Sequence, residues 1–316
     1  MEFDDIERLF YNDFKVFRRP RTPEENEMTQ STARWINRMS GMPVFDEDAI
    51  SSLAKMTDNE QLERYFFFLL DQLFLRDDEF AKLKDKYSFH IIVSDFREIC
   101  TNIIEKDAVI VLEWQYIKYM DMLNSNILYA KSPDEFCKNI EEMFHSFSQK
   151  YWDRREADKN LRYQANDDPV FFKLGTYIQN IQEIFMLGHE LGHILLEDSG
   201  RENTEQGADL MGLQAVINYC RHNEKIICWV IISIELLFTY MTWLDAFRES
   251  DASDRKKVID GWMERYDALF LQLEPYYHRM NENDQELVGY YDTICNKIFD
   301  IGSAGAGVAE GSTDDG

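Results

Sequence analysis

Cysteine and basic residues are the scarce side chains of this sequence. The five cysteines are odd in number, scattered and without a C-x-x-C pair, which argues against a disulfide framework or a thiolate zinc knuckle and indicates a reducing compartment. Only 34 Lys and Arg residues accompany 59 Asp and Glu residues, so the formal net charge is -25. Because this charge would repel phosphate backbones and anionic lipid headgroups, we expect no nucleic-acid partner. A protein partner that is locally basic or apolar fits the charge better.

A secretion signal is also lacking. The opening MEFDDIERLF has no basic segment followed by an apolar one, so we expect a cytoplasmic protein. One apolar run, residues 226–244, contains a single charged residue, Glu235, and is nearly long enough to cross a bilayer. No cluster of basic residues flanks it. A buried core helix is the favoured interpretation, and a membrane span is the alternative.

Apolar residues make up 45% of the 316 positions, enough for one large core or two modest ones. Residues 1–89 are predicted to form a helical N-terminal subdomain. Its helices are expected around Glu24–Met39 and across Gln61–Leu75, where apolar residues recur at spacings of three and four.

β-branched residues cluster at Phe89–Val93 and Ala108–Glu113, and these clusters predict strands. Helices are expected after the second strand and across Asp134–Tyr151. We expect an α+β, mainly α, fold in which residues 90–300 form the main domain with a small sheet. An edge strand at Ala108–Glu113 could pair with extended peptide backbone. The small, glycine-rich residues 301–316 predict a flexible tail.

Three polar residues interrupt an otherwise apolar helical stretch, residues 184–196: His189, Glu190 and His193. A helix that is apolar on all sides is buried, and leaving these groups there without partners would cost several kcal/mol. The four-residue spacing lets both histidines reach one tetrahedral metal ion. Glu190 is rotated by about 100° and suits a general base. The alternative is a buried polar cluster without a metal.

Two glycines, Gly188 and Gly192, share one face of this helix. Each costs roughly 0.5–1 kcal/mol relative to alanine. Either a neighbouring element packs unusually close there, or the glycines clear room for a substrate.

A third metal ligand is expected from the next helix, which begins after a turn at Gly200 with Asn203 or Thr204 as its N-cap. Glu205 and Asp209 lie on one face of that helix. We interpret Glu205 as the third ligand and Asp209 as the carboxylate that orients a ligand histidine. The alternative is an acidic first turn favoured by the helix dipole.

Other zinc peptidase classes fit the sequence less well. The extended metzincin pattern requires Gly and His where this chain has Leu196 and Ser199. A deformylase-type site takes a cysteine upstream of the histidine helix, but Cys100 and Cys137 lack the glycine-rich setting. A glutamate-ligand site remains.

The combination of GHELGH with E-x-x-A-D (Glu205, Ala208, Asp209) resembles the glutamate-ligand zinc peptidases (gluzincins), among them the HtpX-type, ImmA-type and phage-exclusion Lit-type families. With the Lit type the resemblance covers roughly Ala108–Phe247. It implies a zincin-like core, a Zn²⁺ cofactor and Glu205 as a metal ligand. The chain departs from the HtpX pattern because it lacks multiple membrane spans and a His-Pro segment after the apolar helix.

These observations predict a zinc-dependent endopeptidase that hydrolyses a cytoplasmic protein, with Glu190 as general base. The resemblance implies a role in stress or phage defence. Four residues are candidates for stabilising the oxyanion: His222, Tyr240, Tyr276 and His278. The alternative is a non-catalytic zinc-binding sensor or scaffold that acts through protein contacts. The oligomeric state is left open.

Overall fold

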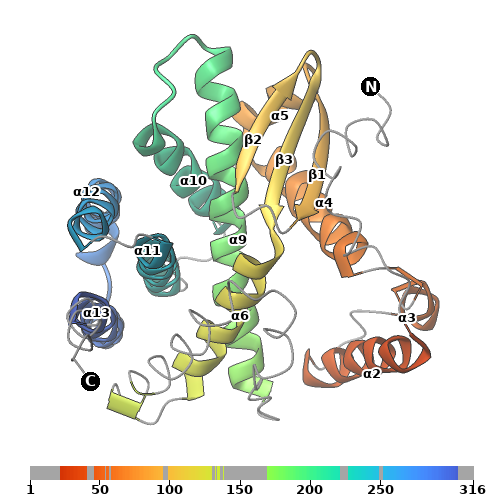
Figure 1. Ribbon diagram of the computed structural model, residues 1–316, viewed down its shortest axis with the longest axis horizontal. Helices are drawn as coiled ribbons and strands as arrows, with labels where there is room; N and C mark the ends of the chain where they lie inside the picture. Colours follow the sequence, from red (N-terminus) through yellow and green to blue (C-terminus); the bar gives the residue numbers. More distant parts are fainter. Residues whose placement is uncertain are drawn as a thin grey trace, which may run out of the picture. The chain divides into compact units, whose positions relative to one another are not determined.

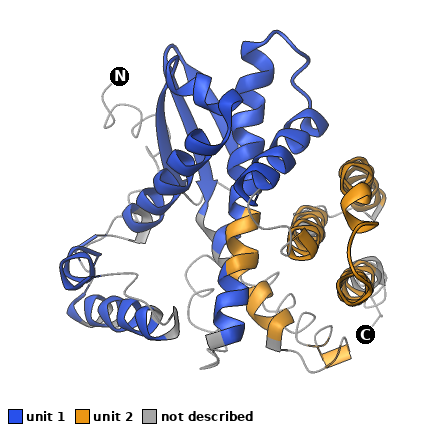
Figure 2. Cartoon of the chain, turned by 180° about the vertical axis from the view of Figure 1, so that it is seen from behind, with its two compact units in different colours: residues 1–119, 167–176, 183–221 blue, residues 120–166, 177–182, 222–316 orange. Residues whose placement is uncertain are grey.

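The computed structural model describes residues 22–40, 46–53, 55–56, 58–94, 99–129, 169–220, 227–248 and 252–304, with four positions between 132 and 138. Its contacts divide the chain into two compact units (Figure 2). Unit 1 comprises residues 1–119, 167–176 and 183–221, and unit 2 comprises residues 120–166, 177–182 and 222–316. The division follows contacts in space, and the boundary predicted near residue 89 falls inside unit 1.

The described residues are mainly helical and include a small mixed sheet, so the α+β, mainly α, prediction is confirmed at this level (Figure 1). Unit 1 holds the sheet together with α2 (Pro23–Ser40), α3 (Glu47–Leu53), α4 (Asp58–Arg76), α5 (Asp78–Lys84), α10 (Glu205–Cys220) and most of α9 (Pro169–Asp198). Helix α6 (Trp114–Tyr129) begins in unit 1 and continues into unit 2.

The sheet has the order β1-β3-β2. Strand β1 (Ser88–Ser94) runs parallel to β3 (Asp107–Glu113), and β2 (Cys100–Ile104) runs antiparallel to β3. The two predicted strands are therefore confirmed. The prediction that Ala108–Glu113 forms an edge strand is wrong, because β3 is paired on both sides and every one of its residues is buried. The two edges of the described sheet belong to β1 and β2.

Strand β2 places its alternate side chains on two faces of the sheet. Cys100 and Ile104 pack against a buried cluster of Ile92, Val109 and Val111. Thr101 therefore belongs to the opposite face, where its hydroxyl reaches Glu190 of α9. The chain turns from β2 into β3 through Glu105, whose φ of 58° is in the left-handed region.

Helix α4 forms across the predicted segment and anchors both the sheet and α9. Its apolar face buries Leu69, Leu70 and Leu73, and the helix packs on β1. On the same helix the hydroxyl of Tyr65 donates to Oε2 of Glu183, at 2.5 Å. This bond ties α4 to the α9 segment just before the histidines.

The far end of α10 is fixed to α4 and α5. The side chain of Arg76 lies over the ring of Tyr219, 4.1 Å from its centroid, and donates to the Tyr219 carbonyl at 2.8 Å. Asp77 caps the N-terminus of α5 and also accepts a hydrogen bond of 2.5 Å from Asn218. These contacts hold α10 in place against the N-terminal helices.

Unit 2 contains α11 (Ile227–Arg248), which packs against both α12 (Ala252–Tyr277) and α13 (Glu282–Ala304). The segment Ile227–Ala246 is long and apolar enough to cross a membrane, and 83% of its window is buried inside the structure. This single helix is weak evidence for a span. Helix α13 runs to Ala304, so the first residues of the predicted flexible tail are helical. Residues 305–316 and most of the helix predicted at residues 134–151 lie outside the described residues.

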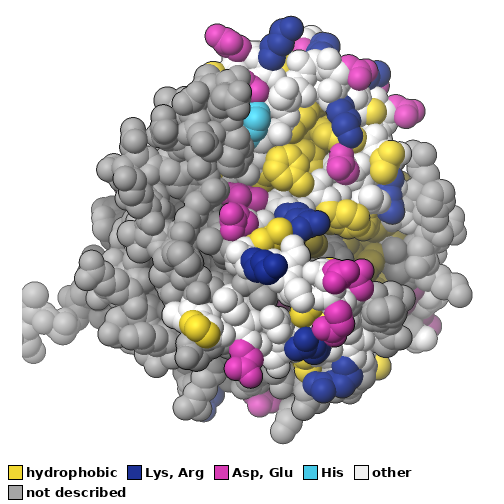
Figure 3. Space-filling view, turned by 90° about the vertical axis from the view of Figure 1, so that its right-hand side faces the viewer, with side chains coloured by type: hydrophobic (Ala, Val, Ile, Leu, Met, Phe, Trp, Pro, Cys, Tyr) yellow, Lys and Arg dark blue, Asp and Glu magenta, His cyan; other side chains and the backbone are white. Residues whose placement is uncertain are grey.

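Charges of both signs are interspersed on the face drawn in Figure 3, where Lys and Arg side chains lie among Asp and Glu side chains and around exposed apolar ones. Ion pairs within unit 1 include Lys84 with Asp71 at 2.9 Å and Lys86 with Asp198 at 2.5 Å. The strongly acidic composition is thus partly compensated locally.

Candidate metal centre

The histidine helix, α9, is buried along the stretch that carries the motif. It begins with Pro169, whose fixed φ suits the first helical position. Leu187, Leu191 and Ile194 are fully buried around the motif. Among them Glu190 is only 3% exposed, whereas the side chains of His189 and His193 are 13% and 21% exposed. The two imidazoles therefore lie at the edge of the core, where an ion can reach them.

The turn between α9 and α10 brings the next helix back over the motif. Gly200 has a φ of +63°, and Arg201 N donates to the Leu196 carbonyl, which closes a Schellman-type end. Thr204 then caps α10, because its hydroxyl accepts from Gly207 N at 3.1 Å. The predicted turn is confirmed, and Thr204, of the two candidates, is the N-cap.

Helices α9 and α10 touch through small residues. A Cβ built on Gly188 would lie 2.5 Å from Ala215 Cβ, and one built on Gly192 would lie 2.8 Å from Met211 Cβ and 3.1 Å from Ala208 Cα. Both are closer than side-chain carbons approach one another. Of the two explanations for these glycines, close packing by a neighbouring helix is confirmed.

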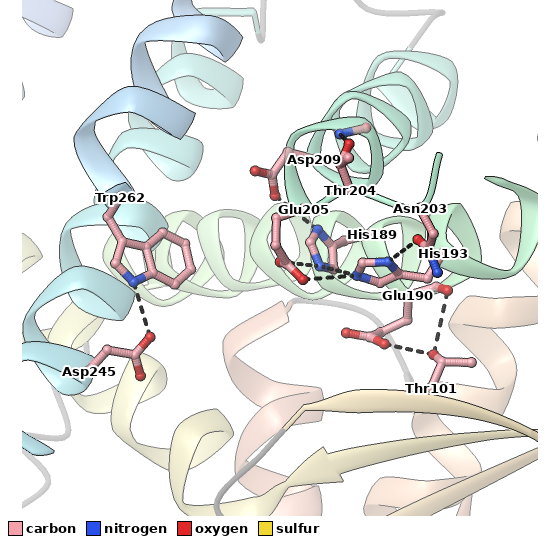
Figure 4. A network of polar contacts seen from close by, with 11 residues as sticks. Thr101, His189, Glu190, His193, Asn203, Thr204, Glu205, Asp209, Asp245 and Trp262 are labelled. Atoms are coloured by element: carbon pink, nitrogen blue, oxygen red, sulfur yellow. Dashed lines mark hydrogen bonds and ion pairs between the residues drawn. The ribbon is translucent and has the colours of Figure 1, made fainter. Parts of the chain in front are cut away.

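Because the helices pack so closely, three candidate ligand atoms converge (Figure 4). The two Nε2 atoms of His189 and His193 are 3.1 Å apart. Oxygens of Glu205 lie 3.5 Å from His189 Nε2 and 3.6 Å from His193 Nε2. Ligands about 2.0–2.1 Å from a tetrahedral zinc ion lie roughly 3.3–3.4 Å from one another. The three residues thus have the spacing and the donor types that zinc requires.

Each imidazole is oriented by a hydrogen bond at its other nitrogen. Nδ1 of His189 is 2.9 Å from Oδ1 of Asp209, a side chain with 1% exposure, and Nδ1 of His193 is 2.7 Å from Oδ1 of Asn203. An ionised carboxylate and an amide oxygen only accept hydrogen bonds, so both Nδ1 atoms carry the hydrogen. Both Nε2 atoms then present lone pairs to one another and to Glu205. Lone pairs that face each other at this distance need a proton or a metal cation between them.

The charges around His189 favour a cation. Burial alone would lower the pKa of His189, but its hydrogen bond to Asp209 and the carboxylates of Glu190 and Glu205 outweigh burial and raise the pKa. A neighbourhood that stabilises a proton on this ring also stabilises a metal ion beside it.

Glu190 points away from Glu205 toward the sheet, where it meets Thr101 of β2 (Figure 4). The Thr101 hydroxyl lies 2.7 Å from Glu190 Oε2 and 3.4 Å from the Glu190 main-chain oxygen. Burial raises the pKa of Glu190, and the two histidines and the Thr101 hydrogen bond only partly oppose this effect. Glu190 is thus a buried carboxyl on the same turn of α9 as the two histidines, and Thr101 holds one of its oxygens.

The structure brings together all five residues that the sequence predicts for the site: His189, Glu190, His193, Glu205 and Asp209. Sequence reasoning missed two partners. Asn203 was considered only as a helix cap, and Thr101 gave no signal because its strand was not predicted. The proposed oxyanion donors Tyr240, Tyr276 and His278 belong to unit 2, and His222 lies outside the described residues, so their role stays a prediction.

No family model, curated protein or solved structure matches the chain. The functional inference therefore depends on the site itself.

Proposed function

We propose that the chain is a zinc-dependent endopeptidase with a zincin-like core and a glutamate as third metal ligand. One observation carries the proposal: the Nε2 atoms of His189 and His193 and the carboxylate oxygens of Glu205 converge within 3.1–3.6 Å of one another, and Glu190 of the same helix is buried. Two imidazoles and one carboxylate are the donor set of catalytic zinc sites, which keep one coordination position open.

The residues divide the work of hydrolysis among them. Asp209 and Asn203 hold the two imidazoles in the tautomer that binds a metal. A bound zinc ion would supply Lewis acidity toward a peptide carbonyl and acidify a water molecule. Glu190 would accept the proton of that water and deliver it to the leaving amine. Burial of Glu190 favours the first of these transfers, since a raised pKa makes the carboxylate a stronger base toward the water proton.

The edge strand β2 suggests how a substrate binds. It lies beside the site and can add an extended peptide by main-chain hydrogen bonding. A locally basic or apolar segment of a cytoplasmic protein suits the net charge of -25. Stress or phage defence is the biological setting that the resemblance to Lit-type peptidases implies. A sensor or scaffold would need the three ligands but not a buried base held by a dedicated hydroxyl, so Glu190 favours catalysis.

The test combines metal content with a substitution at Glu190. Elemental analysis of the purified protein should find one zinc per chain. Glu190→Gln should retain the zinc and abolish cleavage of a quenched fluorescent peptide library, and also remove the new protein termini that appear in cells expressing the active chain. Glu197→Gln, at an exposed position on the same helix, is the matched control and should cleave normally. Zinc-free protein, or a Glu190→Gln variant as active as the original, contradicts the proposal.

A further inference from the structure

We propose that Thr101 is a positioning residue for Glu190: its hydroxyl fixes one carboxylate oxygen so that the other is left for the proton transfer. The inference rests on the endopeptidase function proposed above. Thr101 is 89 positions from Glu190 in the sequence. It lies on β2, outside the helix that carries His189, Glu190 and His193.

The hydroxyl is placed by a rigid element. Thr101 lies opposite Ile110 in the antiparallel pairing of β2 with β3, and β3 is buried along its whole length. A β-branched side chain on a strand has few χ1 rotamers. The donor therefore has little freedom, and Glu190 must adapt to it.

The hydrogen bond uses a defined oxygen. At 2.7 Å, Oε2 of Glu190 is a much better acceptor for the single hydroxyl hydrogen than the main-chain oxygen at 3.4 Å. With Oε2 engaged, the plane of the carboxylate is set and Oε1 remains for another partner. A carboxylate that is 3% exposed would otherwise leave both oxygens in need of donors.

A structural role for Thr101 alone is less consistent with this geometry. A threonine needed only for strand pairing contributes its backbone and its methyl group, and valine serves both purposes. The hydroxyl is the group of Thr101 that hydrogen-bonds to Glu190. Its removal should therefore leave the fold and the ligands of the metal unchanged while the base loses its fixed orientation.

The test compares Thr101→Val with Thr101→Ser. A hydrogen bond to a charged group is worth about 1.5–3 kcal/mol, so the valine variant should lose roughly 10- to 100-fold in kcat, with KM changed less than threefold and zinc content unchanged. Serine restores the hydroxyl and should recover most of the kcat. Thr176→Val is the matched control, because it removes an exposed hydroxyl of α9 that donates to the Phe172 carbonyl of the same helix, and it should behave as the original protein.

A second measurement needs no substrate. Acetohydroxamic acid chelates zinc as its anion and gives its proton to the catalytic carboxylate, so its affinity for the zinc-loaded protein, measured by calorimetry, reports on the alignment of Glu190. Thr101→Val should weaken acetohydroxamate binding about as much as it lowers kcat, and Thr101→Ser should not. Unchanged kcat and acetohydroxamate affinity in the valine variant, or equal losses in both variants, would overturn the positioning role and leave the endopeptidase proposal standing. An original protein that neither binds zinc nor cleaves peptides would overturn the endopeptidase proposal instead.

Discussion

Replacing Gly188 by alanine tests whether the close contact of α9 and α10 builds the metal centre. The added Cβ would lie 2.5 Å from Ala215 Cβ and 3.1 Å from Gly212 Cα. Carbon atoms prefer a separation of about 3.5–4.0 Å. The two helices must therefore move apart by about 1 Å, because both of these neighbours are backbone or directly attached to it.

The free energy of unfolding should fall. Inserting a methyl group into a packed contact costs about 1–3 kcal/mol, and replacing a helical glycine returns about 0.5–1 kcal/mol. A net loss of about 0.5–2 kcal/mol is expected. Zinc affinity should fall further, because Glu205 and Asp209 move with α10 while the histidines stay on α9. A loss of about 10- to 100-fold corresponds to the effect of removing a group that orients a ligand.

Chemical denaturation of the metal-free protein and competition with a chromophoric chelator measure the two losses separately. Gly261→Ala on α12 is the matched control, since its new Cβ would have no neighbour within 4 Å, and it should gain about 0.5–1 kcal/mol. Adding Ala215→Gly to the Gly188→Ala variant removes the worst overlap and should restore part of both quantities. If Gly188→Ala is stabilised like the control and binds zinc normally, the glycines do not set the distance between the helices.

Three further predictions concern side chains of the candidate metal centre and a buried glutamate of α11. Glu205→Ala should lower zinc content far more than Glu202→Ala in elemental analysis, and equal losses would point to a different third ligand. In chelator competition, Asp209→Ala should weaken zinc binding by about 10- to 100-fold and Asn203→Ala by less, since a neutral amide polarises its imidazole less than a carboxylate does. The reverse order would show that Asp209 is not the more important partner of the two histidines. Burial, reinforced by a nearby carboxyl, raises the pKa of Glu235 in α11 to about 9, so its stabilising contribution is complete below pH 4.5 and is lost as the pH rises toward 9. The free energy of unfolding of Glu235→Gln, measured in denaturant titrations, should therefore rise relative to that of the original protein by roughly 1–3 kcal/mol between about pH 5 and 9. A difference between the two proteins that does not vary with pH would show that Glu235 is not buried as a neutral acid.

The elements with a strong periodic pattern could be predicted from the sequence. The apolar face of α4, the β-branched runs of β1 and β3 and the apolar helices α9 and α11 are properties of single segments. The cluster of candidate metal ligands was predictable for the same reason, because His189 and His193 lie on one helix and Glu205 begins the next.

The rest depends on contacts between distant segments. Strand β2, CTNII, is short and partly polar, and it is held in place by its pairing with β3 more than by its own propensity. Missing it made β3 look like an edge strand and hid Thr101. Asparagine is a common residue at helix N-caps, so the sequence suggests only a capping role for Asn203. The arrangement of the two helix ends shows that its side chain reaches His193.

Strand β2 carries the hydroxyl that holds Glu190 and is also an edge strand of the sheet. Main-chain hydrogen bonds formed there by a long substrate would stiffen the strand, and so convert binding energy remote from the scissile bond into alignment of the base. A peptide shortened at the end that pairs with β2 would then be turned over more slowly even at saturating concentration. Selectivity for extended segments would arise from the rate of reaction as much as from affinity.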